Sequence, residues 1–210
     1  FPGSGLWVWA NNASWVSLHP FEASHLAVGN LDSSVGDDVI VDFPGYGVWV
    51  YSSDGTWSQL HGLSATTIVT ADLDGNGLDE SVIDFPGFGL WIRWDNITWS
   101  QLHTQSAVHM AAGNLDNSGE DDLVIDFGLG GGIWTFRNGT TWIPLHGQSS
   151  EGLVLAERDD GSGKDEVIVD FDADRGCSVD DFACDRDVSG AGFRIAAWVI
   201  VQLYTPSHSP

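Results

Sequence analysis

Positively charged residues are scarce in this sequence. Its 210 residues include 7 Lys and Arg against 30 Asp and Glu, which gives a formal net charge of −23. Nucleic-acid backbones and anionic membrane surfaces are themselves negative, so we expect the chain to bind neither. The same excess of carboxylates favours cations as partners.

Long apolar runs and helical patterns are also missing. No segment approaches the roughly 18 consecutive apolar residues that can cross a bilayer, so we expect no membrane insertion. No stretch has the apolar periodicity of an α-helix. The sequence opens at Phe1 without an initiator methionine or a signal-peptide pattern, and we interpret it as a processed mature chain or a segment of a longer one.

Cysteine occurs only twice, as Cys177 and Cys184, in the acidic loop 172–191. This close spacing suits a local disulfide that holds an irregular loop. A zinc site is the rival interpretation, but two cysteines without a nearby histidine do not make a ligand set. A disulfide requires an oxidising compartment, so the pair predicts an extracellular, secreted protein.

One sequence unit recurs along the chain. Near-copies of one segment lie 42, 42 and 43 residues apart: WVSLH (15–19), WSQLH (57–61), WSQLH (99–103) and WIPLH (142–146). A second marker keeps the same period: FPGSG at 1, DFPGYG at 42, DFPGFG at 84, DFGLGG at 126 and DFDADRG at 170. We therefore treat 1–210 as a single domain with repeat units at about 1–19, 20–61, 62–103, 104–146 and 147–210.

The unit 62–103 shows the expected secondary structure most clearly. Four short strands are predicted in it, each bounded by Gly, Asn, Asp or Pro, at 67–72, 80–85, 89–94 and 98–102. Four antiparallel strands in about 42 residues are typical of one blade of a β-propeller. The sequence thus predicts an all-β fold, a β-propeller of four-stranded antiparallel blades.

The number of blades depends on the two incomplete units. The first unit resembles strands three and four of a blade, and the last resembles strands one and two. If these halves pair within the chain, the ring closes with about four blades. If they pair between molecules, the same halves form a strand-exchanged polymer. A third interpretation is that the chain is an arc of a larger propeller, and residues 193–204 read as one further strand.

The loop between the first two predicted strands of unit 62–103 has the pattern of a cation site. Residues 72–80 place Asp72, Asp74, Asn76 and Glu80 around the turn residue Gly77. Ca²⁺ takes six to eight oxygen ligands, so a short loop must offer side-chain oxygens at alternate positions and a closing carboxylate. We therefore predict Ca²⁺ here. The competing interpretation is a solvated Asn-Gly turn, and Mg²⁺ is disfavoured because it keeps more of its own water.

Weaker copies of this loop occur in the other units. Unit 20–61 has Val35 in place of the turn glycine, and its candidate ligands are Asn30, Asp32, Ser34 and Asp38. Unit 104–146 keeps the glycine and offers Asn114, Asp116, Ser118 and Asp122. Unit 147–210 has Arg158 at the first ligand position, where a cation would be repelled.

Residues 67–89, TIVTADLDGNGLDESVIDFPGFG, resemble the FG-GAP or VCBS-type repeat of integrin α-subunit propellers and of propeller lectins from fungi and bacteria. The resemblance covers about residues 1–171. It implies that Ca²⁺ rigidifies the blade and that the protein is a binding or adhesion module, often for glycans. Arg158, the altered loop at Val35 and the cysteine loop depart from the family pattern.

Three N-glycosylation sequons fall at one position of the repeat, namely Asn12, Asn96 and Asn138, with Asp54 at the equivalent place in the second unit. Asn and Asp are also favoured in tight turns, so a turn residue could form a sequon by accident. Three repeats of the pattern favour glycosylation. In an up-and-down sheet the sequon turns and the cation loops emerge at the same end, which leaves the opposite end for a partner.

A glycan or an extracellular protein is the expected partner at that opposite end. We predict contacts from Tyr46, Phe88, His61 and His103, which combine aromatic surface with hydrogen-bonding capacity. The recurring tryptophans are interpreted as packing between blades. The four histidines that end the WxxLH segments are interpreted as loop structure, since they follow the outermost strand and diverge from the axis.

Catalysis is not expected. Adjacent acids such as Asp121 and Asp122 begin strands and point to opposite faces, and DGSGKDE (160–166) lacks the Ser or Thr of a phosphate-binding loop. Two functions therefore compete. One is a lectin-like binding or adhesion module, and the other is a structural subunit whose half-blades exchange between molecules to build an assembly.

Overall fold

The structure, a computed structural model, contains only β-strands in the part of the chain that it describes, residues 5–157 and 163–171. These residues belong to one compact unit, Phe1–Phe171. No helix in the described ranges is long and apolar enough to cross a membrane. Cys177, Cys184, the loop 172–191, Arg158 and the strand expected at 193–204 lie outside the described residues.

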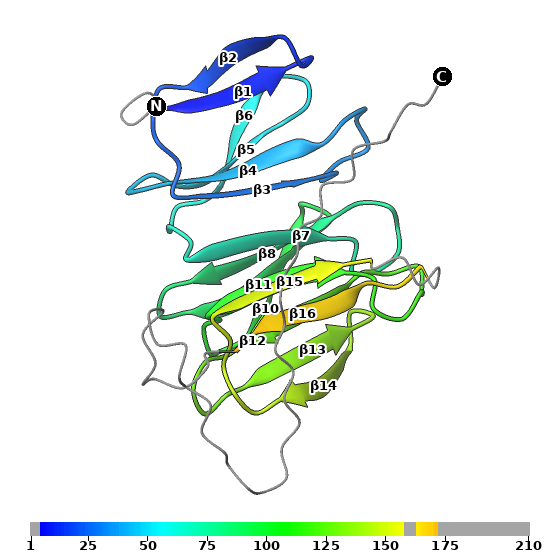
Figure 1. Ribbon diagram of the computed structural model, residues 1–210. Helices are drawn as coiled ribbons and strands as arrows, with labels where there is room; N and C mark the ends of the chain where they lie inside the picture. Colours follow the sequence, from blue (N-terminus) through cyan, green and yellow to red (C-terminus); the bar gives the residue numbers. More distant parts are fainter. Residues whose placement is uncertain (1–4, 158–162, 172–210) are drawn as a thin grey trace, which may run out of the picture. The chain divides into compact units, whose positions relative to one another are not determined.

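Sixteen strands follow one another in the described residues (Figure 1). They are β1 (Leu6–Ala10), β2 (Ser14–His19), β3 (His25–Gly29), β4 (Asp38–Phe43), β5 (Gly47–Tyr51), β6 (Trp57–His61), β7 (Thr67–Ala71), β8 (Glu80–Phe85), β9 (Gly89–Trp94), β10 (Thr98–His103), β11 (His109–Gly113), β12 (Asp122–Asp126), β13 (Ile133–Arg137), β14 (Thr141–His146), β15 (Gly152–Ala156) and β16 (Glu166–Asp170). The four strands predicted in unit 62–103 are confirmed to within one residue.

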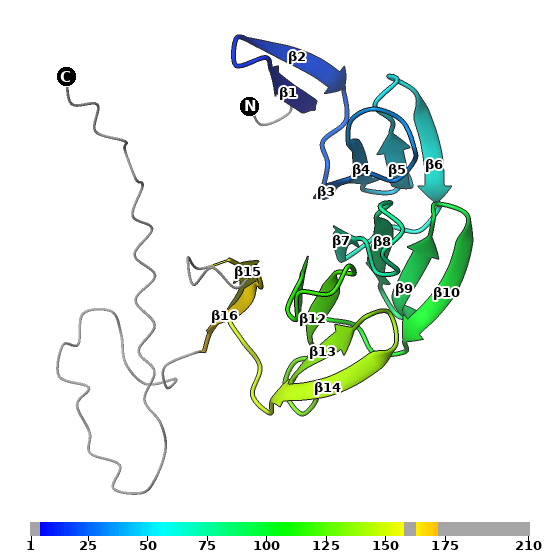
Figure 2. The same cartoon turned by 90° about the vertical axis from the view of Figure 1, so that its right-hand side faces the viewer.

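Every sheet is antiparallel and pairs strands that are adjacent in sequence. Three sheets have four strands, β3-β4-β5-β6, β7-β8-β9-β10 and β11-β12-β13-β14, and two have two strands, β1-β2 and β15-β16 (Figures 1 and 2). The all-β expectation and the four-stranded antiparallel units are confirmed.

The second strand of each four-stranded sheet is covered on both faces. All six residues of β8 and all five of β12 are buried. Their sequences, ESVIDF and DLVID, therefore show no alternation of apolar and polar residues, as expected for a strand between two layers. The fourth strands lie at the sheet edge, and β10 and β14 are mostly exposed or half-buried.

Neighbouring sheets are joined by apolar cores. One core unites Ile40, Val48 and Val50 of the β3–β6 sheet with Ile68 and Ile83 of the next sheet. A second core joins β7–β10 to β11–β14, and a third joins β11–β14 to β15–β16. The first strands of successive sheets also contact one another, β3 with β7, β7 with β11 and β11 with β15. Each four-stranded sheet thus packs against the next sheet along the chain.

A bulge recurs between the third and fourth strands of the repeat. The register shifts at the same place in β1-β2, β5-β6, β9-β10 and β13-β14. In the second of these, Val48 pairs with His61 and Trp49 with Gln59, so Leu60 is the extra residue. A bulge lets two successive side chains reach apolar surroundings. Leu60 packs against the inter-sheet core while His61 contacts Phe85 of the next sheet.

Candidate functional site

The acidic loop 72–80 connects β7 to β8 and folds around Asp72. The carboxylate of Asp72 accepts hydrogen bonds from the backbone N–H groups of Gly75 (2.8 Å), Asn76 (3.1 Å) and Gly77 (2.8 Å). Gly75 and Gly77 have φ of +75° and +88°, a backbone region that residues other than glycine rarely adopt. The two glycines therefore let three backbone donors converge on one acid.

Glu80 closes the loop from inside the protein. Its side chain is buried, and it accepts hydrogen bonds from the backbone N–H of Leu73 (2.8 Å) and of Asp95 (3.3 Å). Burial raises the pKa of Glu80 to about 7, against 4.5 ordinarily, although the two hydrogen bonds oppose the shift. A nearby cation would favour the ionised form and lower this pKa again.

Three carboxylates converge at this loop. One oxygen from each of Asp72, Asp74 and Glu80 lies within 4.8 Å of the other two. Asn76 lies beside them, but its side-chain nitrogen donates to Asp95 Oδ1 at 2.6 Å and its oxygen accepts from Leu78 N at 2.7 Å. The donor set consists of hard oxygens, which suits Ca²⁺. Asp72, Asp74 and Glu80 could therefore hold a cation, with Asn76 available only after its hydrogen bonds rearrange.

The equivalent loops have fewer carboxylates at the candidate ligand positions. In unit 20–61, Asn30 replaces Asp72 and donates its amide to Gly77 O of the next unit at 2.8 Å, while Ser34 N donates to Asp32 Oδ1 at 2.7 Å and Asp38 is buried. In unit 104–146, Asn114 Oδ1 accepts from the backbone of Asn117 at 2.6 Å, Ser118 N donates to Asp116 Oδ1 at 2.9 Å, and Asp122 is buried. At these positions each of the two loops has two carboxylates, whereas 72–80 has three.

A repeated carboxylate ties neighbouring sheets together, and sequence analysis missed it. Asp79 accepts from Asn30 N of the preceding unit at 2.7 Å, and its own N–H donates to Asn30 O at 2.7 Å. The same two-way contact joins Asp121 to Asp72 and Asp165 to Asn114. Burial raises the pKa of both Asp79 and Asp121. The acids next to the candidate ligands thus join neighbouring sheets.

Three equivalent aromatic pockets lie at the junctions between sheets. The first has a volume of about 190 Å³ and is lined by His19, Phe21, Phe43, Tyr46, Trp49 and Trp57. The second has about 300 Å³ and is lined by His61, Leu63, Phe85, Phe88, Trp91 and Trp99. The third has about 280 Å³ and is lined by His103, Gln105, Phe127, Gly131, Trp134 and Trp142. Each combines the end of one sheet's fourth strand with the second to fourth strands of the following unit.

The histidine of each pocket is held in one orientation. His61 Nδ1 accepts a hydrogen bond from Leu63 N at 3.1 Å, and the ring lies 4.5 Å from that of Phe85. His19 and His103 make the same contacts, each accepting at 3.1 Å. An accepting Nδ1 means that the neutral ring carries its proton on Nε2. Burial also lowers the pKa of His61, which keeps this ring neutral near pH 7. Nε2–H is therefore the polar group that this ring can offer to a ligand.

The tryptophan at the start of the third strand is fixed in the same way in all three pockets. Trp91 Nε1 donates to Phe88 O at 3.1 Å, and Trp49 and Trp134 donate to Tyr46 O and Gly131 O. Because the indole N–H is already satisfied, these rings present apolar surface to the pocket. Phe88 and Tyr46 are more than half exposed, at 56% and 57%, and form part of the pocket walls open to solvent.

The four predicted ligand contacts fall in these pockets but do not form one site. His61 and Phe88 share the second pocket, Tyr46 lies in the first and His103 in the third. The sequence predicts packing for the recurring tryptophans and loop structure for the repeated histidines. Those residues do pack, and they also line the pockets. The signal that could have found them was the fixed period of the His, Phe and Trp positions across three units.

A comparison with protein-family models and with curated proteins finds no match.

The sequons occupy the turns between third and fourth strands. Asn12, Asn96 and Asn138 have φ of +52°, +54° and +48°, which agrees with the turn preference of Asn. Asn138 also contacts the cation-type loop of its own unit, donating to Asp116 Oδ2 at 3.2 Å and accepting from Ser118 Oγ at 3.0 Å. These contacts place the sequon turn and the acidic loop at the same end of the sheet.

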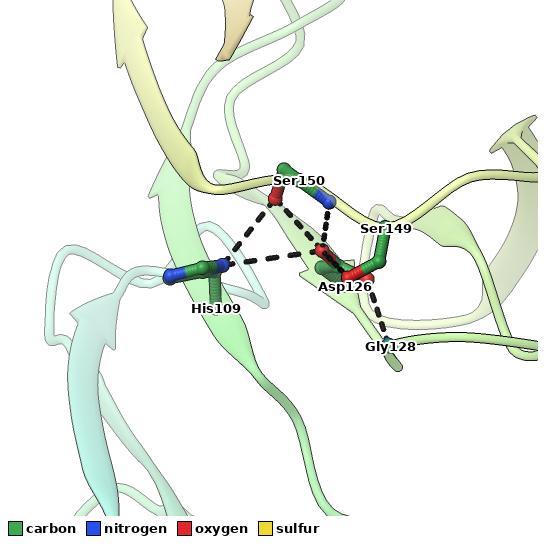
Figure 3. Close-up of polar contacts among 5 residues, drawn as sticks. All are labelled: His109, Asp126, Gly128, Ser149 and Ser150. Carbon is green, nitrogen blue, oxygen red and sulfur yellow. Dashed lines mark hydrogen bonds and ion pairs between the residues drawn. The ribbon is translucent and has the colours of Figure 1, made fainter. Parts of the chain in front are cut away.

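Asp126, the last residue of β12, is the centre of a polar cluster (Figure 3). Its Oδ2 accepts from Ser150 N (2.6 Å), Ser150 Oγ (2.7 Å) and Ser149 Oγ (2.9 Å), and its Oδ1 accepts from Gly128 N at 2.7 Å. Burial disfavours the charge, but these hydrogen bonds outweigh it and lower the pKa of Asp126.

The serine, histidine and aspartate of this cluster are not arranged as a catalytic relay. His109 Nδ1 lies 3.3 Å from Ser150 Oγ and 3.9 Å from Asp126 Oδ2, and the other ring nitrogen points away from both (Figure 3). In a relay the two ring nitrogens of histidine separate the nucleophile from the acid. Here the serine hydroxyl donates directly to the carboxylate, so the cluster holds the segment before β15 against β12.

Proposed function

We propose that this chain is a non-catalytic carbohydrate-binding module built as a β-propeller of the FG-GAP or VCBS type, stabilised by Ca²⁺. The period of about 42 residues, the up-and-down four-stranded sheets and the contacts between successive first strands support the propeller. The convergence of Asp72, Asp74 and Glu80 supports the cation. The resemblance of residues 67–89 to propeller lectins supports the function.

The three equivalent aromatic pockets are the observation on which the proposed function rests. Their lining repeats a histidine, a phenylalanine and two tryptophans at the same places of the fold. Aromatic rings can stack on the apolar face of a sugar ring, and Nε2–H of the histidine can donate to a sugar hydroxyl. With volumes of about 190 to 300 Å³ each pocket suits one small saccharide unit. Repetition would give the module several sites and hence avidity for multivalent glycans.

The first pocket should bind more weakly than the other two. In this pocket the ring of Phe21 stacks on that of Tyr46, with centroids 4.8 Å apart and an angle of 23° between the planes. The other two pockets have Leu63 and Gln105 in place of Phe21. The volume of the first pocket is also the smallest of the three. A ligand there would have to separate the stacked pair.

A glycan array followed by calorimetric titration tests the proposal. We expect the full chain to bind a saccharide class on the array, and titration with that saccharide to give two strong sites and one weak site. Phe88→Ala should remove one strong site, because it takes away part of the second pocket's wall. Ile97→Ala is the matched control, since Ile97 is 70% exposed in the turn between β9 and β10 and lines none of the three pockets. Folded protein that binds nothing on the array, or Phe88→Ala with unchanged stoichiometry, would contradict the proposal.

The proposed setting is extracellular. The sequons at Asn12, Asn96 and Asn138 and the proposed disulfide between Cys177 and Cys184 support it. An extracellular protein that carries glycans would then be a natural partner. Glycopeptide mapping after expression through a secretory route, with and without reduction, measures both modifications, and unmodified asparagines with two free thiols would contradict the setting.

A further inference from the structure

Two sheets in the described residues are incomplete, and they are complementary. Sheet β1-β2 has the bulge and the WxxLH ending that mark the third and fourth strands of the repeat. Sheet β15-β16 has the register of first and second strands, since Gly152 pairs with Asp170 as Thr67 pairs with Asp84. Joined in the order β15-β16-β1-β2, the two halves would make one more four-stranded sheet.

The outer edges of β1 and β16 have no partner strand among the described residues. Among the described strands, β1 pairs only with β2 and β16 only with β15. Val8 of β1 is 40% exposed, whereas its equivalents Val50 and Ile92 are each 1% exposed. Ile168 of β16 is likewise only half-buried, whereas its equivalent Val82 is fully buried. An open apolar edge of this kind is a template for pairing with another strand.

The complete sheets fix the register that this pairing would take. Ile40 pairs with Val50, and Val82 with Ile92, at the centre of the contact between second and third strands. The equivalent residues at the open edges are Ile168 and Val8. The pairing would therefore place Ile168 opposite Val8, Asp170 opposite Leu6 and Val167 opposite Trp9.

The exposure of two first-strand residues shows that the two incomplete sheets do not complete each other within this structure. Leu26 on β3 is 52% exposed although its equivalent Ile68 is 7% exposed, because the sheet that should cover it lacks first and second strands. Val154 on β15 is 56% exposed. Its equivalent Val69 packs against the following sheet, so Val154 lies where a following sheet would cover it. If the two incomplete sheets joined within one chain, they would cover Leu26 and Val154, yet both residues are more than half exposed. The missing strands are available on a second copy.

We propose that β16 of one molecule pairs with β1 of a second copy, in the register Ile168 opposite Val8, and that this strand complementation assembles the protein. Each copy carries one edge of each kind, so the contact repeats from copy to copy until a ring closes. A charge of −23 per chain opposes association, and salt screens this repulsion. Assembly should therefore increase with ionic strength as well as with protein concentration.

Cysteine cross-linking between differently tagged full chains tests the register. One chain carries Val8→Cys and the other Ile168→Cys, and directly opposed residues in antiparallel strands are close enough for a disulfide. We expect a cross-linked heterodimer whose linked peptides contain positions 8 and 168. Pairing Val8→Cys with Val169→Cys is the control, since the side chain at 169 lies on the other face of the sheet. Equal cross-linking by both pairs, or none by the first, would overturn the proposal.

Light scattering of the unmodified chain provides a second, independent readout. We expect the mean mass to rise with concentration and with salt, and Ile168→Lys to remain monomeric while its melting curve stays cooperative. Val35→Lys makes the same kind of change at a loop residue that is 99% exposed, and it should assemble as the unmodified chain does. A monomer at all concentrations would overturn the proposal. So would a single chain carrying both cysteines that cross-links only to itself. Either result would leave the saccharide titration unaffected.

Discussion

The carboxyl of Glu80 should make the stability of the cation-free protein fall as pH rises. Burial raises its pKa from the usual 4.5 to about 7 in the folded state. Between these two pH values the folded protein holds a proton that the unfolded chain has released, so the stabilisation is fully present below about pH 4.5 and is lost as pH approaches and passes 7. At about 1.4 kcal/mol per pH unit, the interval corresponds to a loss of up to roughly 3 kcal/mol.

A bound cation should reverse this dependence. Ca²⁺ binds the ionised carboxylate, so protons compete with it most strongly below pH 7. A ligand present at one hundred times its dissociation constant adds about 2.7 kcal/mol to the free energy of unfolding. The stabilisation by Ca²⁺ should thus be small at pH 5 and largest at pH 8, where the cation-free protein is least stable.

Urea unfolding followed by tryptophan fluorescence, from pH 5 to 8 with Ca²⁺ or with chelator, measures both effects. Glu80→Gln removes the titrating group, and we expect it to lose both the pH slope in chelator and the stabilisation by Ca²⁺. Glu151→Gln makes the same change at an exposed position outside the loop and should keep both. The reasoning would be refuted if Glu80→Gln retained the wild-type slope, or if Ca²⁺ stabilised this variant as much as the wild type.

Three further outcomes are expected. Gly113→Ala should lower stability by about 1 kcal/mol in urea titrations, because its methyl group would displace the Asp165 carboxylate from Asn114 N, whereas Ala71→Gly should cost less. Asp126→Asn should lower the free energy of unfolding by about 1–3 kcal/mol more than Asp84→Asn. Both carboxylate oxygens of Asp126 accept from backbone N–H groups, so the amide nitrogen of an asparagine there must face one of these donors. Chelation should lower the melting temperature yet change saccharide affinity measured by calorimetry less than about threefold, since the acidic loop and the pockets lie at opposite ends of the strands, roughly 15–20 Å apart at about 3.3 Å per residue.

The comparison between Asp126 and Asp84 follows from the turn sequence. Gly128 supplies the N–H that bonds Asp126 Oδ1. The equivalent residues after Asp42 and Asp84 are Pro44 and Pro86, which have no N–H, and Oδ1 of both acids lacks a protein hydrogen-bond partner. An asparagine at 84 can therefore place its amide at a position where no donor opposes it. At 126 either orientation of the amide meets a donor.

The strands could be predicted from the sequence because the repeat supplies several copies of each signal. Their bounds follow from glycine, proline and asparagine at the turns, and 67–72 differs from the observed β7 by a single residue. The convergence of acids at 72–80 also follows from local spacing, since all the candidate ligands lie within nine residues. The strand bounds and the acidic cluster both depend on residues close together in the sequence, so both can be predicted from a short segment.

The pockets and the inter-sheet ties depend on neighbours from a different unit. His61 meets Phe85 only because the bulge at Leu60 and the core around Ile68 bring two sheets together. Asp79 precedes the candidate ligand Glu80, and successive residues at a strand start point to opposite faces. Its carboxylate therefore turns to Asn30 of the preceding sheet. One unit read alone could not reveal either contact.

The ties themselves show how a small residue on one strand controls the contact between sheets. Gly29 and Gly113 leave room for the carboxylates of Asp79 and Asp165, which accept from the backbone N–H of the next residue at 2.7 and 2.9 Å. Ala71 holds the equivalent place opposite Asp121, and there the same hydrogen bond lengthens to 3.2 Å. The methyl group of Ala71 thus accompanies a longer hydrogen bond from Asp72 N to the Asp121 carboxylate. The backbone hydrogen bond from Asp121 N to Asp72 O stays at 2.7 Å. The junction that follows the three-carboxylate loop is consequently the one with the longest side-chain hydrogen bond of the three.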